Sequence, residues 1–432
     1  MKRNHRKDII TALVVGFALF ATFFGAGNLI FPPVLGELTG PSWWLGFIAF
    51  LLTDAGLAVL TVLAAARREG SLEDHLGHLG KWPARIICFL MMFSIGPLLV
   101  VPRTAATTYE MSILPLLGHF SPWIFSLVFF ALVALLTIRP AAVVDIIGKF
   151  LTPVLLLTLL ALCVKGIITP IGPVVQPEDP TPAVRIGILY GYQTMDALMA
   201  VPIAIIVFKS LEAKGYSGRK EKLRMTAYAC LVAFLGLFLV YGGLTFLGAT
   251  ASDLDLGGLG GTELLVEITR RLLQQTGAVV LGVVVFLACL TTAIGIVSAA
   301  SDYFSGLLKG RIPYSWLVLA ICCLGVFLSN LGTSQIIALA EPLLVLIYPV
   351  FLTQILLSFF SDRIRNPWVY RGAALGAALF SLLDLLEGYL LITLPFVNEM
   401  PLSSVGLAWI LPAAAGGLLG MLIPRTGPSS QA

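Results

Sequence analysis

Polar and helix-breaking residues interrupt an otherwise apolar segment near the start of the chain. Gly25, Gly27 and Asn28 stand inside residues 9–35, and a Pro-Pro pair follows them closely. Glycine weakens a helix by roughly 1 kcal/mol relative to alanine, and an unpaired amide is costly in hydrocarbon. The alternative is a small-residue packing face for a neighbouring helix, which explains the glycines but neither Asn28 nor the prolines. We therefore expect a broken membrane helix whose bare backbone groups bind a ligand.

A second apolar segment, residues 185–208, carries a similar interruption. It holds Gly191, Tyr192, Gln193, Thr194, Asp196 and Pro202. The two interruptions stand five apolar segments apart, and an odd offset places the second half of the chain upside down relative to the first. Interrupted helices at matching positions of two halves are typical of inverted-repeat transporters, whose binding site lies at the breaks.

A third group of oxygen-bearing side chains lies in a later apolar segment. Thr291, Thr292 and Ser298 offer hydroxyl oxygens without a formal charge, a donor set that suits a weakly held monovalent cation. The alternative is that these hydroxyls bond back to carbonyl groups of their own helix, as membrane Ser and Thr residues often do.

Four carboxylic acids lie deep in apolar segments, where acids are functional candidates by default. Asp196 ranks first because it lies in an interruption. Glu341 precedes a proline and marks either a gate or a structural hydrogen bond, whereas Asp54 and Glu387 are interpreted as structural.

The third apolar segment contains a Gly-Pro pair at 96–97, which predicts a kink, and then Arg103. We expect Arg103 to extend to the membrane surface or to pair structurally with Glu110. Closure of an outer gate is the alternative role.

The composition is that of a polytopic membrane protein. The 432 residues are 58% hydrophobic and only 12% charged, more apolar surface than a soluble domain can bury. Each membrane-spanning helix needs about 20 apolar residues. Long apolar runs, unlike the alternating strands of a β-barrel, are centred near residues 22, 55, 96, 129, 154, 196, 236, 291, 321, 348, 381 and 413.

The placement of basic residues predicts the orientation. With a cytoplasmic N-terminus, the inner segments hold 22 of the 27 Lys and Arg residues, as the positive-inside rule requires. Twelve helices then place both termini in the cytoplasm. The first apolar run is longer than the core of a signal peptide, so we expect an uncleaved first helix.

The connection at residues 249–276 ends in an amphipathic pattern over residues 263–273. This pattern predicts a helix on the outer surface that acts as a lid. The alternative is an ordinary ordered loop.

Four runs of residues carry a family resemblance, and the similarity extends over nearly the whole chain in the same order. They are residues 17–33, 96–108, 192–198 and 290–295. Together they resemble the signature sequences of the bacterial branched-chain amino acid:cation symporters, the BrnQ or LIVCS family. That family implies uptake of leucine, isoleucine and valine, driven by Na⁺ or H⁺, in the bacterial inner (cytoplasmic) membrane.

The resemblance also implies a fold. The family belongs to the amino acid–polyamine–organocation superfamily, whose members share the LeuT-type 5+5 inverted repeat. We therefore expect an all-α polytopic membrane protein with twelve transmembrane helices, of which helices 1 and 6 are broken. Residues 1–432 then form a single transporter domain, with a first five-helix repeat at 9–165, an inverted second repeat at 183–360 and two additional helices at 370–424.

Site residues follow from the short motifs and the breaks. The resemblance implies that the unwound first helix holds the carboxylate and ammonium groups of the substrate; the sixth-helix residues are inferred from the break alone. The predicted substrate-binding residues are Phe23, Gly25, Ala26, Gly27, Asn28, Tyr192, Gln193, Thr194 and Asp196. By the same resemblance, the predicted Na⁺ ligands are Ala21, Phe24, Ala288, Thr291 and Thr292.

The resulting reading is a secondary symporter that works by alternating access. It is not an enzyme, because the sequence lacks phosphate-loop, zinc-protease and serine-hydrolase motifs. Symport of another small solute by the same architecture is the alternative, and a channel fits less well because the chain carries its own internal pair of breaks.

Na⁺ is favoured over H⁺ as the coupling ion, with no other cofactor. The expected partners are the amino acid, a monovalent cation and membrane lipids, without nucleic acid or an obligate protein partner. Stoichiometry, oligomeric state and preference among the three amino acids stay open.

Overall fold

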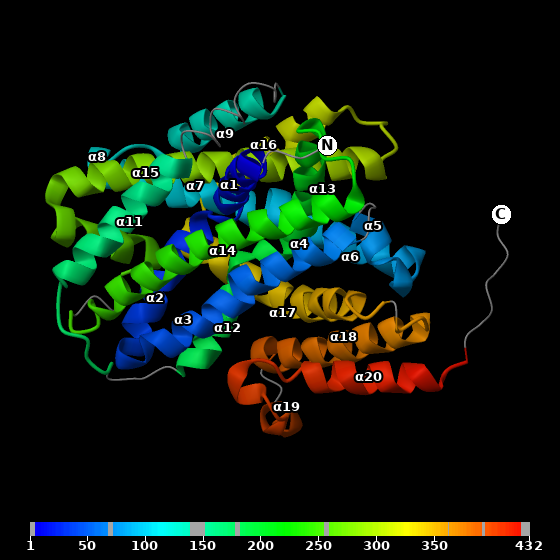
Figure 1. The fold of residues 1–432 in the computed structure, drawn as a ribbon. Coiled ribbons are helices and arrows are strands. Elements are labelled where there is room, and N and C mark those ends of the chain that lie inside the picture. The colour runs from blue at the N-terminus through cyan, green and yellow to red at the C-terminus, as the bar shows by residue number, and fades with distance from the viewer. Residues whose placement is uncertain are drawn as a thin grey trace. The chain divides into compact units, whose positions relative to one another are not determined.

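A computed structural model describes residues 5–67, 72–138, 152–177, 182–254, 259–361, 363–390 and 394–424. All regular elements in these ranges are helical (Figure 1). The chain divides into two compact units, the first made of residues 1–66 and 92–340 and the second of residues 67–91 and 341–432.

The helices are assigned to the two units as follows. The elements that lie in the first unit are α1 (His5–Phe23), α2 (Ala26–Thr39), η1 (Gly40–Ser42), α3 (Trp43–Leu51), η2 (Leu52–Gly56), η4 (Ser94–Leu98), α7 (Val100–Thr108), η5 (Tyr109–Ile113), α8 (Leu114–Leu117), α9 (Pro122–Ile138), α11 (Thr152–Ile168), α12 (Ala183–Thr194), α13 (Asp196–Ala213), α14 (Arg219–Ala249), α15 (Gly261–Leu307) and α16 (Tyr314–Ser329). The elements in the second unit are α5 (Leu72–His75), η3 (Gly77–Leu79), α18 (Pro367–Leu390), α19 (Pro395–Glu399), η7 (Ser403–Val405) and α20 (Ile410–Leu422). The helices that run from one unit into the other are α4 (Leu57–Arg67), α6 (Lys81–Phe93) and α17 (Thr333–Ser358).

The helices agree with the predicted membrane segments. Each of the twelve predicted centres lies inside a helical element of the described chain. By length and composition alone, six helices can cross a membrane, or up to seven when the bent pair α12–α13 counts as one span. Four shorter apolar helices, α9, α11, α16 and α20, supplement these. The protein is therefore multi-pass, and the number of twelve crossings stays a prediction.

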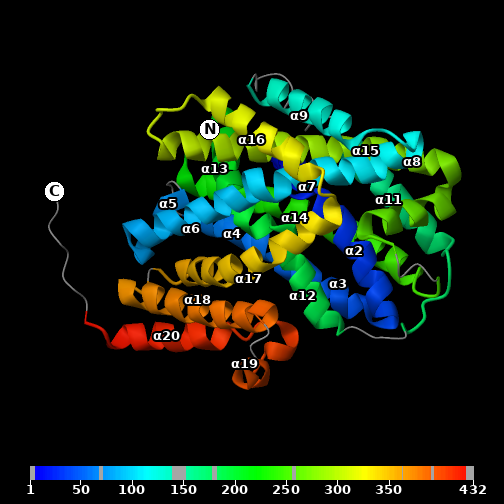
Figure 2. The ribbon, with the colours of Figure 1, turned by 180° about the vertical axis from the view of Figure 1, so that it is seen from behind.

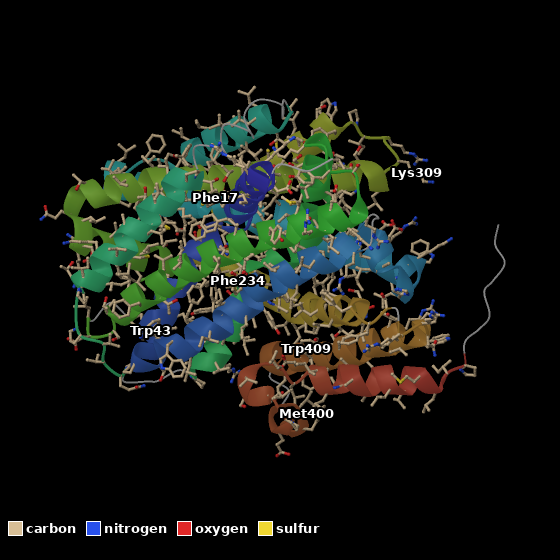
Figure 3. The ribbon with its side chains drawn as sticks, viewed as in Figure 1. Phe17, Trp43, Phe234, Lys309, Met400 and Trp409 are labelled. Atoms are coloured by element: carbon tan, nitrogen blue, oxygen red, sulfur yellow. The ribbon has the colours of Figure 1, made fainter. Side chains whose placement is uncertain are left out.

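Close contact between α2 and α14 sets the framework of the first unit. A Cβ atom on Gly36 would overlap the carbonyl oxygen of Thr245, and one on Gly248 would overlap that of Pro33. Small residues of this kind let two helix backbones touch in a membrane, where lipid supplies little driving force for association. Trp43, at the start of α3, and Lys309, just beyond α15, lie at opposite ends of this unit (Figure 3).

The third apolar segment contains the predicted kink as a π-helical turn, η4, followed by α7. Pro97 lies inside this turn and cannot donate a backbone hydrogen bond. Beyond it, α7 runs beside α15 and α16 (Figure 2). All nine residues of α7 are buried.

The connection at residues 249–276 contains the predicted helix as the first part of α15. Gln274 has a left-handed backbone (φ 58°) and kinks α15 there. Leu264 and Leu265 are buried before the kink, and Glu267 pairs with Arg270 and Arg271 at 2.8 Å. The hydrogen bond from Arg270 is the main cause that lowers the pKa of the Glu267 carboxyl below its usual range. The loop alternative is wrong for this segment, and its role as a lid stays a prediction.

The second unit depends on a backbone-to-backbone contact between α18 and α20. Cβ atoms on Gly372 and Gly376 would overlap the carbonyl oxygens of Gly416 and Pro412. Elsewhere in this unit, the rings of His78 and Tyr370 stack with centroids 4.3 Å apart.

The α18–α20 contact gives a prediction on stability. Gly376→Ala should lower the melting temperature of the detergent-solubilised protein, because overpacking typically costs about 1–3 kcal/mol. Gly417→Ala is the matched control, since a Cβ there would meet its nearest atom, Ala373 Cβ, at an ordinary 3.5 Å. Equal melting curves for the two variants would contradict the close contact.

Candidate functional site

The predicted break in the first membrane segment is confirmed. α1 ends at Phe23 and α2 begins at Ala26, with Gly25 extended (φ −115°, ψ −163°) between them. The Gly25 N–H donates to Asn28 Oδ1 at 3.3 Å, so the asparagine side chain caps the new helix. The second half-helix therefore begins at Ala26, two residues before Asn28, where we expected it to begin.

The predicted break in the sixth segment is also confirmed. α12 ends at Thr194, α13 begins at Asp196, and the two helices bend by 42°. The hinge is Met195, whose backbone is left-handed (φ 68°, ψ 13°) and whose N–H bonds to the Tyr192 carbonyl at 3.1 Å. Gly191, which the sequence places in the same interruption, is helical and packs closely on η2, where a Cβ atom would overlap Thr53.

The side-chain amide of Asn28 joins the two breaks. Its Nδ2 atom donates to Asp196 Oδ2 at 2.9 Å, contacts Asp54 Oδ2 at 3.4 Å and bonds to the hydroxyl of Tyr241. All four side chains are at most 2% exposed. Asp54 also meets Thr194, with 2.7 Å between Oδ1 and Oγ1. Asp54 therefore belongs to this cluster, which its interpretation as a structural acid did not foresee.

Arg103 occupies the sixth-segment break, and its expected placement at the membrane surface is wrong. It is 2% exposed and donates to the backbone carbonyls of Gln193 at 2.8 Å and Thr194 at 3.3 Å. These carbonyls form the negative end of the α12 dipole, which a guanidinium stabilises. Glu110, its expected partner, instead accepts from Thr262 Oγ1 and the Thr333 N–H, both at 2.8 Å.

Arg103 also reaches the first break. Its Nη2 atom lies 2.9 Å from where a Cβ on Gly27 would stand, and its guanidinium carbon lies 5.8 Å from the centre of the Phe31 ring. Thus Gly27 leaves the room that the guanidinium fills between α2 and α12. The backbone carbonyls of Gln193 and Thr194 at the sixth-segment break are therefore not bare, because both accept hydrogen bonds from Arg103.

Several buried polar atoms around the two breaks have no hydrogen-bond partner among the described residues. They are Arg103 Nε, Gln193 Oε1 and Asp196 Oδ1. Buried polar atoms are nearly always paired, so such atoms mark what a ligand supplies. One donor and two acceptors, on Arg103 and on residues at the sixth-segment break, match a molecule that both accepts and donates hydrogen bonds.

Of the predicted ion ligands, Ala21 lies in α1, Phe24 lies in the first break, and Ala288, Thr291 and Thr292 lie in α15. Thr292 packs on Gly25, since a Cβ there would lie 3.5 Å from Thr292 Oγ1. That buried Oγ1 has no partner within the described chain, whereas Thr291 Oγ1 bonds back to the Ala288 carbonyl at 2.8 Å. The structure thus brings Thr292 to the break and gives Thr291 the alternative, helix-internal bond.

The remaining predicted residues are buried near the breaks. Ala21, Phe23 and Phe24 are at most 9% exposed at the end of α1, and Ala26 is buried in the first turn of α2. Tyr192 is buried in the last turn of α12. Sequence reasoning missed Tyr241, which lies in α14 with no motif around it. Its available signal was a hydroxyl group within a long apolar helix.

The buried position of Arg103 predicts a large effect of its removal. Arg103→Ala leaves two carbonyls unpaired, at about 1–3 kcal/mol each, and should lower the melting temperature of the purified protein strongly. The control Arg271→Ala removes a half-exposed pair that contributes about 0–1 kcal/mol. A melting temperature for Arg103→Ala equal to that of the control would contradict the capping role.

Comparison with solved structures confirms the LeuT-type fold. Mhp1, a nucleobase-cation-symport-1 family transporter with bromovinylhydantoin bound, has a TM-score of 0.65 and 16% identity over 94% of this chain and 91% of its own. A Na⁺-coupled sialic acid symporter in a substrate-bound outward-open state has a TM-score of 0.59 and 15% identity over 96% and 90%. At such low identity, these likenesses establish the fold alone.

Comparison with known sequences identifies the family. Branched-chain amino acid permease BraB of Bacillus subtilis (strain 168) is 35% identical over 99% of both chains. Branched-chain amino acid transport system 2 carrier protein of Pseudomonas aeruginosa is 34% identical over 96% of both chains. The family model described as branched-chain amino acid transport protein matches residues 7–426. The chain therefore belongs to the family of branched-chain amino acid transport proteins.

Proposed function

We propose that this protein takes up leucine, isoleucine and valine together with Na⁺ by alternating access. The family and the names of its relatives support the substrates, and the cation-coupled transporters of the same fold support symport. The excess of Lys and Arg in alternate connections supports an inner-membrane location with both termini in the cytoplasm.

The observation that carries the proposal is the set of buried polar atoms on Arg103, Gln193 and Asp196 that have no hydrogen-bond partner among the described residues. An amino acid is a zwitterion, and both of its ends find a complement there. Asp196 Oδ1 takes the ammonium group. The first N–H groups of α2, at Ala26 and Gly27, and the Arg103 guanidinium take the carboxylate, which the positive end of the α2 dipole also favours.

The aliphatic side chain of the substrate needs only an apolar surface, and apolar residues dominate the buried surroundings of both breaks. One methylene group in such a pocket changes binding by roughly 1–3 kcal/mol. The three branched-chain amino acids should therefore compete with one another, and labelled-leucine counterflow separates this substrate class from another small solute.

The sodium ion is proposed to bind between α1 and α15. Carbonyl oxygens of Ala21, Phe24 and Ala288 and the hydroxyls of Thr291 and Thr292 would surround it. The buried, partnerless Thr292 Oγ1 beside Gly25 supports this assignment. An ion that joins α15 to the first break also shapes the substrate site, so each ligand raises the affinity of the other.

The ion site is tested in proteoliposomes. Wild-type leucine uptake should follow an imposed Na⁺ gradient, and Thr291→Val with Thr292→Ala should raise the half-maximal Na⁺ concentration about tenfold or more, equivalent to about 1.4 kcal/mol. Thr158→Val is the matched control, because that exposed hydroxyl bonds only to the Val154 carbonyl of its own helix, at 2.8 Å. Wild-type Na⁺ dependence in the double variant would disprove the ligand set.

The substrate site is tested by filling the space beside Gly27. Gly27→Leu should abolish leucine binding to the purified protein, because its side chain would displace the Arg103 guanidinium and Phe31. Gly306→Leu is the control, since a Cβ at Gly306 meets nothing within 4 Å. Leucine affinity of Gly27→Leu within about twofold of wild type, less than 1 kcal/mol, would place the substrate elsewhere.

A further inference from the structure

The second membrane-spanning segment carries a buried carboxyl group that the proposed substrate and sodium contacts do not use. Asp54 lies in the π-helical turn η2, and its exposed fraction is 0%. A π-helical turn inserts one residue into a helix and recurs at functional sites. Here the turn lies against α12, and Asp54 meets Thr194 at the end of that helix.

The two short contacts of Thr194 Oγ1 compete for its single hydrogen while Asp54 is ionised. Thr194 Oγ1 lies 2.6 Å from the Gly191 carbonyl oxygen and 2.7 Å from Asp54 Oδ1. A hydroxyl carries one hydrogen, and a carbonyl oxygen can only accept. Once Thr194 donates to Gly191, the contact with Asp54 is a hydrogen bond only when Asp54 Oδ1 carries a proton.

The charge of the cluster leads to the same state. Asp54 and Asp196 both lie within reach of Asn28 Nδ2, at 3.4 and 2.9 Å, and are fully buried. Arg103 is the cation beside them, and the phenol of Tyr241 also faces the pair. Two carboxylates this close disfavour each other's ionisation. One proton on the pair leaves one anion opposite one guanidinium.

We propose that Asp54 is a proton-binding site, separate from the sodium ligands, whose occupancy is linked to substrate binding. With the proton in place, Asp54 donates to Thr194 and fixes η2 to the end of α12. Asp196 is then the single anion of the pair and accepts the substrate's ammonium group. The linkage rests on the proposed function, whereas the protonation itself does not.

Loss of the proton to water changes this arrangement. Asp54 becomes a second carboxylate beside Asp196 and loses its hydrogen bond to Thr194. Repulsion between the carboxylates then drives η2 away from the α12–α13 break. Because proton and substrate act on the same break, each must change the affinity for the other. The effect of the proton is present at low pH and is lost as the pH rises.

Infrared spectroscopy of the purified protein without substrate tests the protonation. The carbonyl band of a protonated, buried carboxyl group should be present in wild type, shift in D₂O and disappear in Asp54→Asn. Glu110→Gln is the control and should leave the band unchanged, since both Glu110 oxygens accept hydrogen bonds as a carboxylate does. A band that persists in Asp54→Asn overturns the proposal.

A second variant protects this test against misfolding. Thr194→Val keeps Asp54 but removes the acceptor of its proton, so the band should move to higher frequency. An unmoved band would show that the proton is not shared with Thr194.

Leucine binding at fixed Na⁺ and varied pH tests the linkage. Wild-type affinity should fall with rising pH by up to about tenfold per pH unit, the limit for one linked proton. Asp54→Asn, whose amide still donates to Thr194, should bind leucine equally across the range. Equal pH dependence in wild type and variant overturns the linkage. Absence of leucine binding in wild type at every pH contradicts the proposed function instead, and the infrared result stands apart from it.

Discussion

A backbone that leaves the helix at membrane depth must find new partners for its N–H and C=O groups, and the structure of this protein is arranged around that requirement. The side-chain amide of Asn28 meets it from both sides. Its oxygen accepts the Gly25 N–H at the first break, and its nitrogen donates to Asp196 at the second. One side chain thus ties together two helix ends that stand 168 residues apart in sequence.

Supporting elements hold this amide in place by close backbone contact. Gly36 and Gly248 let α2 lie directly on α14, and α14 thereby brings Tyr241 to the amide nitrogen. From the other side, the π-helical turns η2 and η4 precede or contain the residues that reach the site, Asp54 and Arg103. The two breaks and the turns η2 and η4 are therefore the departures from regular helix that serve the buried charges.

Sequence reasoning located the breaks because a break needs residue types that are rare in membrane helices. Gly25 and Asn28 carried that signal at the first break, and a crowd of polar residues up to Asp196 carried it at the second. The hydrogen-bond partners of the buried polar side chains were harder to predict. The neighbouring sequence does not distinguish an arginine that extends to the membrane surface from one that caps a distant helix. The prediction for Arg103 is wrong for this reason, since its contact with the Thr194 carbonyl depends on the tertiary structure.

The same limit applies to the restart of the first helix and to the sixth-segment hinge. Whether Asn28 lies outside a helix or caps it depends on its side-chain oxygen, which the sequence does not place. The sequence marks the interruption but does not select its hinge: Gly191 packs closely on Thr53, and the left-handed residue is Met195. Tertiary packing decided both outcomes.

The left-handed backbone of Met195 has an energetic consequence for the working protein. A side chain in that conformation costs about 1–2 kcal/mol, and the surrounding contacts must supply this energy. Any conformation of the protein in which Met195 relaxes to a right-handed backbone recovers it. A difference of that size changes the ratio of two populations by a factor of about 5–30. The non-glycine hinge of the sixth segment therefore stores strain that a right-handed Met195 backbone would release.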